Sequence, residues 1–281
     1  MKKLLCLLLM LGTIVFCSCN SKNDPDDVED GALKGKFSVS AGKQVQFSKG
    51  NLQYHASTQT WQFASKQYEF IGKDNKNIGK AYNGLIDLFG WGTGYDPTHS
   101  TEVESDYYDY VEWGYNAISN GGNKVKMWRT LEASEWAYIF TGRDNADILF
   151  GLGNIDGVKG VILLPDDWTL PEGAFFTPST SKGLVYQNGV FKNSNLDNFS
   201  HNTYTGSQWK TMESAGAVFL PAAGIRTYDK EISDNGLAGY YWSSTWDGAY
   251  FAYFLNFDHE SLTPNSVKYR ICYGRSVRLV K

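Results

Sequence analysis

Histidine and cysteine most directly suggest metal or nucleophile chemistry, and the 281-residue chain has four of each. Zinc motifs hold such residues at short spacing, because several ligands must reach one ion. The histidines here lie far apart, and none forms a His-x-x-x-His or Cys/His cluster: His55, His99, His201 and His259. The chain also has no Gly-x-Ser-x-Gly elbow and no Walker loop, and the segment 151–153 lacks the third glycine of a dinucleotide motif. We therefore expect no enzyme activity and no cofactor.

One metal alternative stays open, a structural calcium ion in an acidic, tyrosine-rich stretch. Calcium prefers oxygen ligands of the kind that this stretch supplies. The spacing of the acids does not match an EF-hand loop, and a solvated acidic loop is the alternative interpretation. The residues concerned are Asp96, Glu102, Glu104, Asp106, Tyr107, Tyr108, Asp109, Tyr110 and Glu112.

The N-terminus reads as an export signal. Lys2 and Lys3 precede the apolar run 4–16, which is too short to span a bilayer and suits a signal peptide. A small residue before Cys19 resembles a bacterial lipobox, so we expect a lipoprotein signal peptide over 1–18 and lipidation at Cys19. The acidic segment 19–35 is expected to be a flexible tether. These features predict a lipid anchor in the outer membrane with exposure at the cell surface; ordinary secretory cleavage and a plain linker are the alternatives.

Cysteine usage and charge narrow the expectations further. Cys6 and Cys17 would leave with the signal peptide and Cys19 would carry lipid, so only Cys272 would remain and no internal disulfide could form. Stability must then come from an apolar core, which a chain of this length can supply. The net charge of -4, without a basic run, argues against nucleic acid as a partner.

Many glycines, few prolines and 15% aromatic residues favour short strands and loops over a helical bundle. The patterns predict a single α+β domain over 36–281, with one main helix from Leu131 to Thr141 that Thr130 caps and Gly142 ends. The segments 90–126 and 177–209 are expected to be long loops, with a possible hairpin over 185–191. The expected strands cover 37–39, 45–47, 52–54, 61–63, 161–164, 218–220, 240–244, 252–257 and 276–280.

Two sets of motifs carry a resemblance to a known family. The run 128–131 (Trp-Arg-Thr-Leu), followed by 135–138 (Glu-Trp-Ala-Tyr), resembles the helix region of the C-type-lectin-like fold, in the branch shared with formylglycine-generating enzymes. The C-terminal motifs strengthen the likeness: Tyr-Trp-Ser-Ser-Thr at 241–245, Leu-Asn-Phe at 255–257 and Gly-Arg-Ser-Val-Arg at 274–278. With the runs 87–94 and 219–224, they resemble exported lipoproteins that a diversity-generating retroelement varies at the C-terminus.

The resemblance implies a binding protein with a fixed scaffold and a variable ligand site near 246–273. A retroelement randomises positions that its template encodes with adenine. Randomised AAC or AAT codons never yield Lys, Glu, Gln, Met or Trp, so Trp242, Trp246, Glu260 and Lys268 should be fixed. The candidate ligand-binding residues are Asp247, Tyr250, Phe251, Phe254, Asp258, His259, Ser261, Asn265, Ser266, Tyr269, Ile271 and Cys272.

Strand periodicity places Tyr253, Leu255 and Phe257 on a core face, and Phe254 and Asp258 opposite, toward solvent or ligand. Core packing is the alternative explanation for so many aromatic residues. The expected ligand is a protein, a glycan or a viral surface. A fixed-specificity adhesin or glycan-binding lipoprotein is a second hypothesis. A formylglycine-generating-type oxidase is a third, which requires Cys272 in a deep pocket.

Overall fold

The computed structural model describes residues 30–107, 109–192, 198–248 and 250–281. The expected signal peptide (1–18), the lipidated Cys19 and most of the expected tether (19–35) lie outside these ranges. Within them, no helix combines the length and apolarity needed to cross a membrane.

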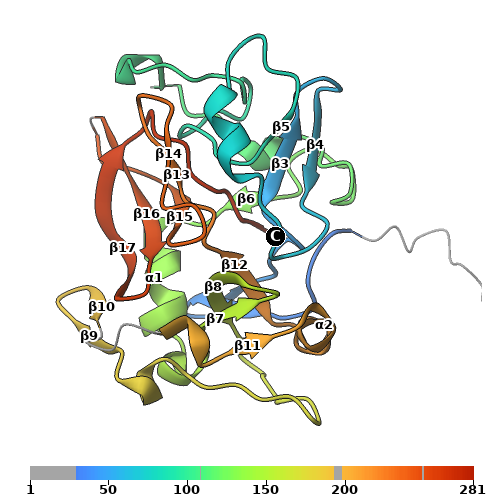
Figure 1. Ribbon diagram of the computed structural model, residues 1–281, viewed down its shortest axis with the longest axis vertical. Coiled ribbons are helices and arrows are strands. Elements are labelled where there is room, and N and C mark those ends of the chain that lie inside the picture. Colours follow the sequence, from blue (N-terminus) through green and yellow to red (C-terminus); the bar gives the residue numbers. More distant parts are fainter. Residues whose placement is uncertain (1–29, 108, 193–197, 249) are drawn as a thin grey trace, which may run out of the picture.

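The fold is α+β, with two α-helices in the described ranges and mostly short antiparallel strands (Figure 1). The helices are α1 (Ala133–Thr141) and α2 (Gly206–Ser214). Short 3-10 turns cover Gly72–Asn77, Glu104–Tyr107, Trp113–Tyr115, Ala146–Ile148, Thr180–Lys182 and Asn198–Ser200. The strands are β1 (Phe37–Ser40), β2 (Lys43–Val45), β3 (Leu52–His55), β4 (Thr60–Phe63), β5 (Leu85–Ile86), β6 (Arg129–Thr130), β7 (Phe150–Ile155), β8 (Val158–Leu163), β9 (Val185–Gln187), β10 (Val190–Lys192), β11 (Thr203–Tyr204), β12 (Val218–Pro221), β13 (Ile225–Arg226), β14 (Ile232–Ser233), β15 (Gly239–Trp246), β16 (Phe251–Phe257), β17 (Ser261–Arg270) and β18 (Leu279–Val280).

The largest sheet has the order β15-β16-β17-β10-β9, is antiparallel and lies along the left side of the view in Figure 1. One face packs against α1 and carries Tyr241 and Leu255 into a first core. The other face carries Trp242 and Phe254 into a second core, which also contains Phe89. Because both faces are buried, the polar-apolar alternation of a one-sided sheet is absent from these strands.

A second sheet, β11-β7-β8-β12, packs against α2. Thr205 caps α2 by accepting a hydrogen bond from the backbone N–H of Gln208 at 3.2 Å. The buried side of the helix places Trp209 and Met212 against Phe219 of β12. The first residues of this helix, 206–209, lie in the segment expected to be a loop, and β7 was not among the expected strands.

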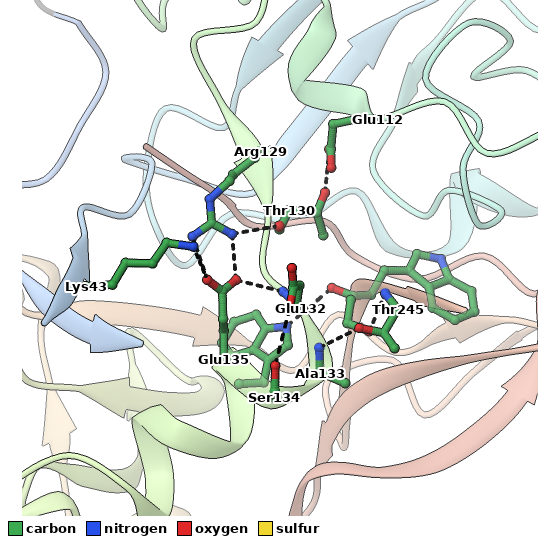
Figure 2. Close-up of polar contacts among 12 residues, drawn as sticks. Lys43, Glu112, Arg129, Thr130, Glu132, Ala133, Ser134, Glu135 and Thr245 are labelled. Carbon is green, nitrogen blue, oxygen red and sulfur yellow. Dashed lines mark hydrogen bonds and ion pairs between the residues drawn. The ribbon is translucent and has the colours of Figure 1, made fainter. Parts of the chain in front are cut away.

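Polar contacts at the start of α1 join the two sets of motifs that are far apart in the sequence (Figure 2). The backbone N–H of Ala133 donates to Oγ1 of Thr245 at 2.9 Å, and the N–H of Ser244 donates to the carbonyl of Leu131 at 2.9 Å. Thr130 was expected to cap the helix, but its hydroxyl instead donates to Oε1 of Glu112 at 2.6 Å. The helix therefore begins two residues later than predicted.

Glu135 is the centre of this cluster, although only 4% of its surface is exposed. Its carboxylate accepts two hydrogen bonds from the Arg129 guanidinium, at 2.5 and 2.8 Å, and one from the Lys43 amine at 2.8 Å (Figure 2). Burial alone would raise the pKa of Glu135. The hydrogen bonds from Arg129, Lys43 and the Glu132 backbone outweigh burial, so the pKa is lowered.

The C-terminal segment 271–280 is buried along its whole length. Isolated β-bridges pair Arg275 with Phe89, Gly274 with Arg226 and Ser276 with Tyr241. The segment ends as β18, which pairs with β6. The segment is therefore interior as far as Val280, and Lys281 is half-buried; the C-terminus lies near the centre of the view in Figure 1.

Two boundary expectations are wrong. Residues 30–35, expected to be flexible tether, pack on the body: Ala32 bridges Ser48, and the Leu33 N–H donates to the Phe47 carbonyl at 2.8 Å. The strand expected over 276–280 covers only β18. The hairpins around 40–43 and 188–189 are confirmed.

We expect Glu135→Gln to lower the free energy of unfolding at pH 7 by about 2 kcal/mol, because a buried charge-assisted network is lost. The pKa of Glu135 is lowered in the folded state, so its contribution is present above the unfolded value of 4.5 and is lost as pH falls through the folded pKa. The difference between the two proteins should therefore shrink below pH 4.5 in urea titrations. Glu172→Gln, at an exposed position, is the matched control; equal losses in both variants at pH 7 would contradict the role of Glu135.

Candidate ligand-binding face

The connection between β15 and β16 exposes large aromatic side chains. Trp246, Tyr250 and Phe251 have 46%, 48% and 37% of their surface exposed. Gly248 supplies the positive φ of +86° that the turn needs, and no atom lies within 4 Å of a Cβ built there. The Asp247 N–H donates to the Phe251 carbonyl at 3.1 Å and closes the turn. These residues, which we call the aromatic turn (246–248 and 250–251), lie together on the surface.

The inner side of the aromatic turn is anchored to the second core. The ring of Trp246 stacks on Trp91, with centroids 6.4 Å apart. The hydroxyl of Tyr253 donates to Oδ1 of Asp247 at 3.3 Å. Tyr253 was predicted to lie on a core face, but it is only half-buried. The backbone N–H of Ile271 donates to the Tyr250 carbonyl at 3.0 Å and ties the turn to the C-terminal segment.

A second group of predicted site residues lies at the opposite end of β16. Asp258, His259 and Ser261 form the turn into β17. The carboxylate of Asp258 accepts hydrogen bonds from the backbone N–H groups of Glu260 and Ser261, at 2.8 and 2.7 Å. A seven-residue strand separates the two ends by about 23 Å. The predicted site is therefore split between two turns, and Asp258 has a local turn-stabilising role.

Three predicted site residues do not lie on the surface. Phe254 is 2% exposed, and Ile271 and Cys272 are fully buried in the second core. The expectation that Ile271 and Cys272 belong to an outward face is wrong, because the segment after β17 turns into the interior. Phe254 faces a cavity and not open solvent.

The Cys272 thiol has an environment that suppresses reactivity. Burial, followed by the nearby Glu104 carboxylate, raises the pKa of this thiol to about 11. The thiol is therefore protonated at neutral pH, whereas a nucleophilic cysteine needs a lowered pKa. Cys272 also does not line the cavity beside β15 and β16.

The remaining predicted residues lie along β17. Asn265 is partly buried, and the side chains of Ser266 and Tyr269 lie outside the described structure. The backbone of β17 still places Tyr269 opposite Ala252 in the ladder. Of the positions expected to be fixed, Trp242 is fully buried, whereas Trp246 and Glu260 are exposed.

Sequence reasoning missed Arg270, which extends the aromatic turn. Arg270 stands opposite Phe251 in the ladder and forms an ion pair with Glu104 at 2.9 Å. Its guanidinium lies 5.8 Å from the Tyr228 ring, a cation–π distance. The only sequence signal was its place directly before Ile271, at the end of the expected variable segment.

A cavity of about 330 Å³ opens beside the same strands. It lies between the β13–β14 hairpin and the face of the sheet that carries Phe254. Sequence analysis missed it because strands of two residues leave no periodic pattern. Its lining residues are Ile225, Thr227, Ser233, Asp234, Tyr240, Phe254, Asn256, Tyr273 and Arg275.

The acidic side chains considered as calcium ligands contact different partners. Glu112 accepts from Thr130 and from the Gly114 N–H, while Glu104 pairs with Arg270. No group of three or more metal-ligating side chains occurs in the part of the chain that the structure describes.

Comparison of the chain with family models, with curated proteins and with solved structures finds no match.

The variants Phe251→Ser and Phe254→Ser form a matched pair three residues apart on one strand. We expect Phe251→Ser to change the free energy of unfolding by less than about 1 kcal/mol, because its ring is already partly in solvent. We expect Phe254→Ser to cost at least about 3 kcal/mol, because it empties a packed position. Equal losses in chemical denaturation would contradict the division between exposed turn and buried framework.

Proposed function

We propose that this protein is a surface-anchored ligand-binding lipoprotein whose C-terminal segment is diversified by a retroelement. The observation that carries the proposal is the contrast within one hairpin. Tyr250 and Phe251 are exposed at the turn, while Trp242 and Phe254 in the flanking strands are buried. Side chains at such a turn can change without disturbing the strands that hold it.

The exposed residues have the chemistry of a recognition surface. Aromatic side chains offer large contact areas at a low cost in side-chain entropy, and clustered aromatic residues carry much of the binding energy at interfaces. Tyr250 and Phe251 lie beside Arg270 and Asp247, which add charges of both signs. We assign ligand contact to this end of the segment 246–273.

The C-type-lectin-like fold is part of the proposal. Its support is the joining of the run 128–136 to the run 242–245. The backbone N–H groups of Ala133 and Ser244 each donate a hydrogen bond across these two runs. A third hydrogen bond runs from Nε1 of Trp136 to the Trp242 carbonyl at 3.4 Å. A framework of this kind holds the aromatic turn from behind, through residues that a variable segment does not include.

The first described residues and the proposed face lie on different sides of the molecule. The first described residues, in blue, enter at the right of the view in Figure 1, whereas β15, β16 and β17 lie at the left. Lipidation at Cys19 would attach the protein through the segment that leads into this side, away from the aromatic turn. Such an orientation presents the turn outward from an outer-membrane surface to a protein, a glycan or a virus.

Sequencing of the DNA around the gene tests the diversification. We expect a near-copy of the segment encoding 242–275 close to a reverse-transcriptase gene, differing from it only at adenines of the copy. Codons for Tyr250 and Phe251 should be among the differing positions, and codons for Trp242 and Trp246 should not. A genome without such a copy, or differences spread over all four bases, would contradict retroelement diversification and favour a binding protein of fixed specificity.

A further inference from the structure

A second cavity, of about 440 Å³, opens on the sheet β4-β3-β5, which lies to the right of β16 and β17 in Figure 1. One face of this sheet carries Leu52, Trp61 and Phe63 into the second core. Because side chains alternate along a strand, Gln53 and Gln62 point to the other face, where both line the cavity. No residue of 246–273 lines it, so an inference about this cavity is independent of the proposed function.

The two glutamines form an amide pair that is open on one side. They stand opposite each other in the ladder, and Nε2 of Gln62 donates to Oε1 of Gln53 at 3.1 Å. Two amides can join through two hydrogen bonds, but among the described residues only this one forms. The donor Nε2 of Gln53 and the acceptor Oε1 of Gln62 are left over. A third amide, that of Asn120, is already used by the N–H and the carbonyl of Phe63.

The open amide pair lies deep but can be reached from the cavity. Only 6% of the surface of Gln53 is exposed, so its amide is not in open solvent. Neither Nε2 of Gln53 nor Oε1 of Gln62 is among the unpaired polar atoms that packing seals from solvent in the described structure. A buried donor without a partner is costly, and a ligand carbonyl bound at this point would remove the cost.

The other walls restrict the kind of ligand. Phe70, Ile71 and Leu85 are half-buried and form what we call the apolar wall. Glu69 is the one charged residue in the lining, and its Oε2 accepts a hydrogen bond from the Ser65 hydroxyl at 2.6 Å. A lining with one negative charge and no cation disfavours anionic ligands. The volume is within the range of pockets that hold small molecules.

We propose that this cavity binds a small uncharged molecule with an amide edge, in which an N–H and a C=O stand side by side. The ligand carbonyl accepts from Nε2 of Gln53 and the ligand N–H donates to Oε1 of Gln62, so the ligand completes the open amide pair. Its apolar body lies against the apolar wall. A carboxylate lacks the donor and is repelled by Glu69, and a ketone lacks the donor as well. Two sources share this edge: a primary carboxamide on an aromatic ring, and the lactam edge of a nucleobase.

Ligand-observed NMR titrations of the full chain test the amide edge without any substitution. Benzamide, benzoate and acetophenone have the same ring and similar size, but only benzamide has an N–H beside its C=O. We expect benzamide to bind at least about ten-fold more tightly than the other two. Uracil distinguishes the sources: if it binds more tightly than benzamide the source is a nucleobase, and the reverse order indicates a primary carboxamide. The proposal is overturned if neither benzamide nor uracil binds, or if benzoate or acetophenone binds as tightly as benzamide.

The variant Gln53→Met places the binding in the cavity. It removes the donor and keeps a side chain of similar length, so we expect the tighter of the two amide probes to bind at least about ten-fold more weakly. Gln187→Met, at an exposed position of β9, is the matched control and should bind as the parent protein does. Undiminished binding in Gln53→Met, or an equal loss in both variants, would show that the probe does not bind at the amide pair.

A change of preference separates a contact from a structural role. Gln53→Glu replaces the NH₂ donor by a second acceptor, which suits an amidinium that donates two hydrogen bonds. We expect this variant to lose benzamide and to bind benzamidine more tightly than the parent protein does, whereas a disturbed fold would weaken the binding of both. Urea titration shows whether the variant is folded. A folded Gln53→Glu that still prefers benzamide contradicts the assigned contacts.

Discussion

The fold depends on two arginine side chains that the C-terminal segment carries into the interior. A buried guanidinium is costly unless aromatic faces or hydrogen-bond acceptors surround it. Arg275 lies between Trp242 and a second ring, and Arg278 donates to Oε1 of Gln67 at 2.7 Å. Burial lowers the pKa of Arg278 to about 10, so it remains charged at neutral pH. Because each guanidinium must reach these rings or this acceptor, the two arginines fix the path of residues 271–280. That path in turn sets the position of the largest sheet against both cores.

That constraint divides the hairpin of β15 and β16 into a framework and a free end. The strands are covered on both faces, so their side chains are set by packing. The turn at Tyr250 and Phe251 projects beyond the cores. It is held by the stacking of Trp246 on Trp91 and by the hydrogen bond from the Ile271 N–H to the Tyr250 carbonyl. A binding protein with a changeable surface requires this combination, because new side chains can be accepted only where they do not alter the core.

Local sequence patterns predicted the elements whose signals are local. The hairpin around 40–43, the helix ended by Gly142 and the core positions Leu255 and Phe257 are confirmed. Strand β17 was missed because Pro264 and Asn265 interrupt its pattern where the ladder with β16 shifts register. Cys272 could not be placed, because its burial arises from long-range bridges to residues around 89 and 226 that no local pattern encodes. The cavity escaped prediction for the same reason, since its walls come from segments far apart in the chain.

Hydrogen exchange followed peptide by peptide tests the central claim most directly. We predict that amides of 275–280 exchange only on global unfolding and are among the slowest in the protein, whereas those of 247, 248, 250 and 251 exchange orders of magnitude faster. Peptides from β7 and β8, which form the centre of the other large sheet, provide an internal reference for the globally protected core. Exchange of the C-terminal segment as fast as that of the aromatic turn would contradict the account.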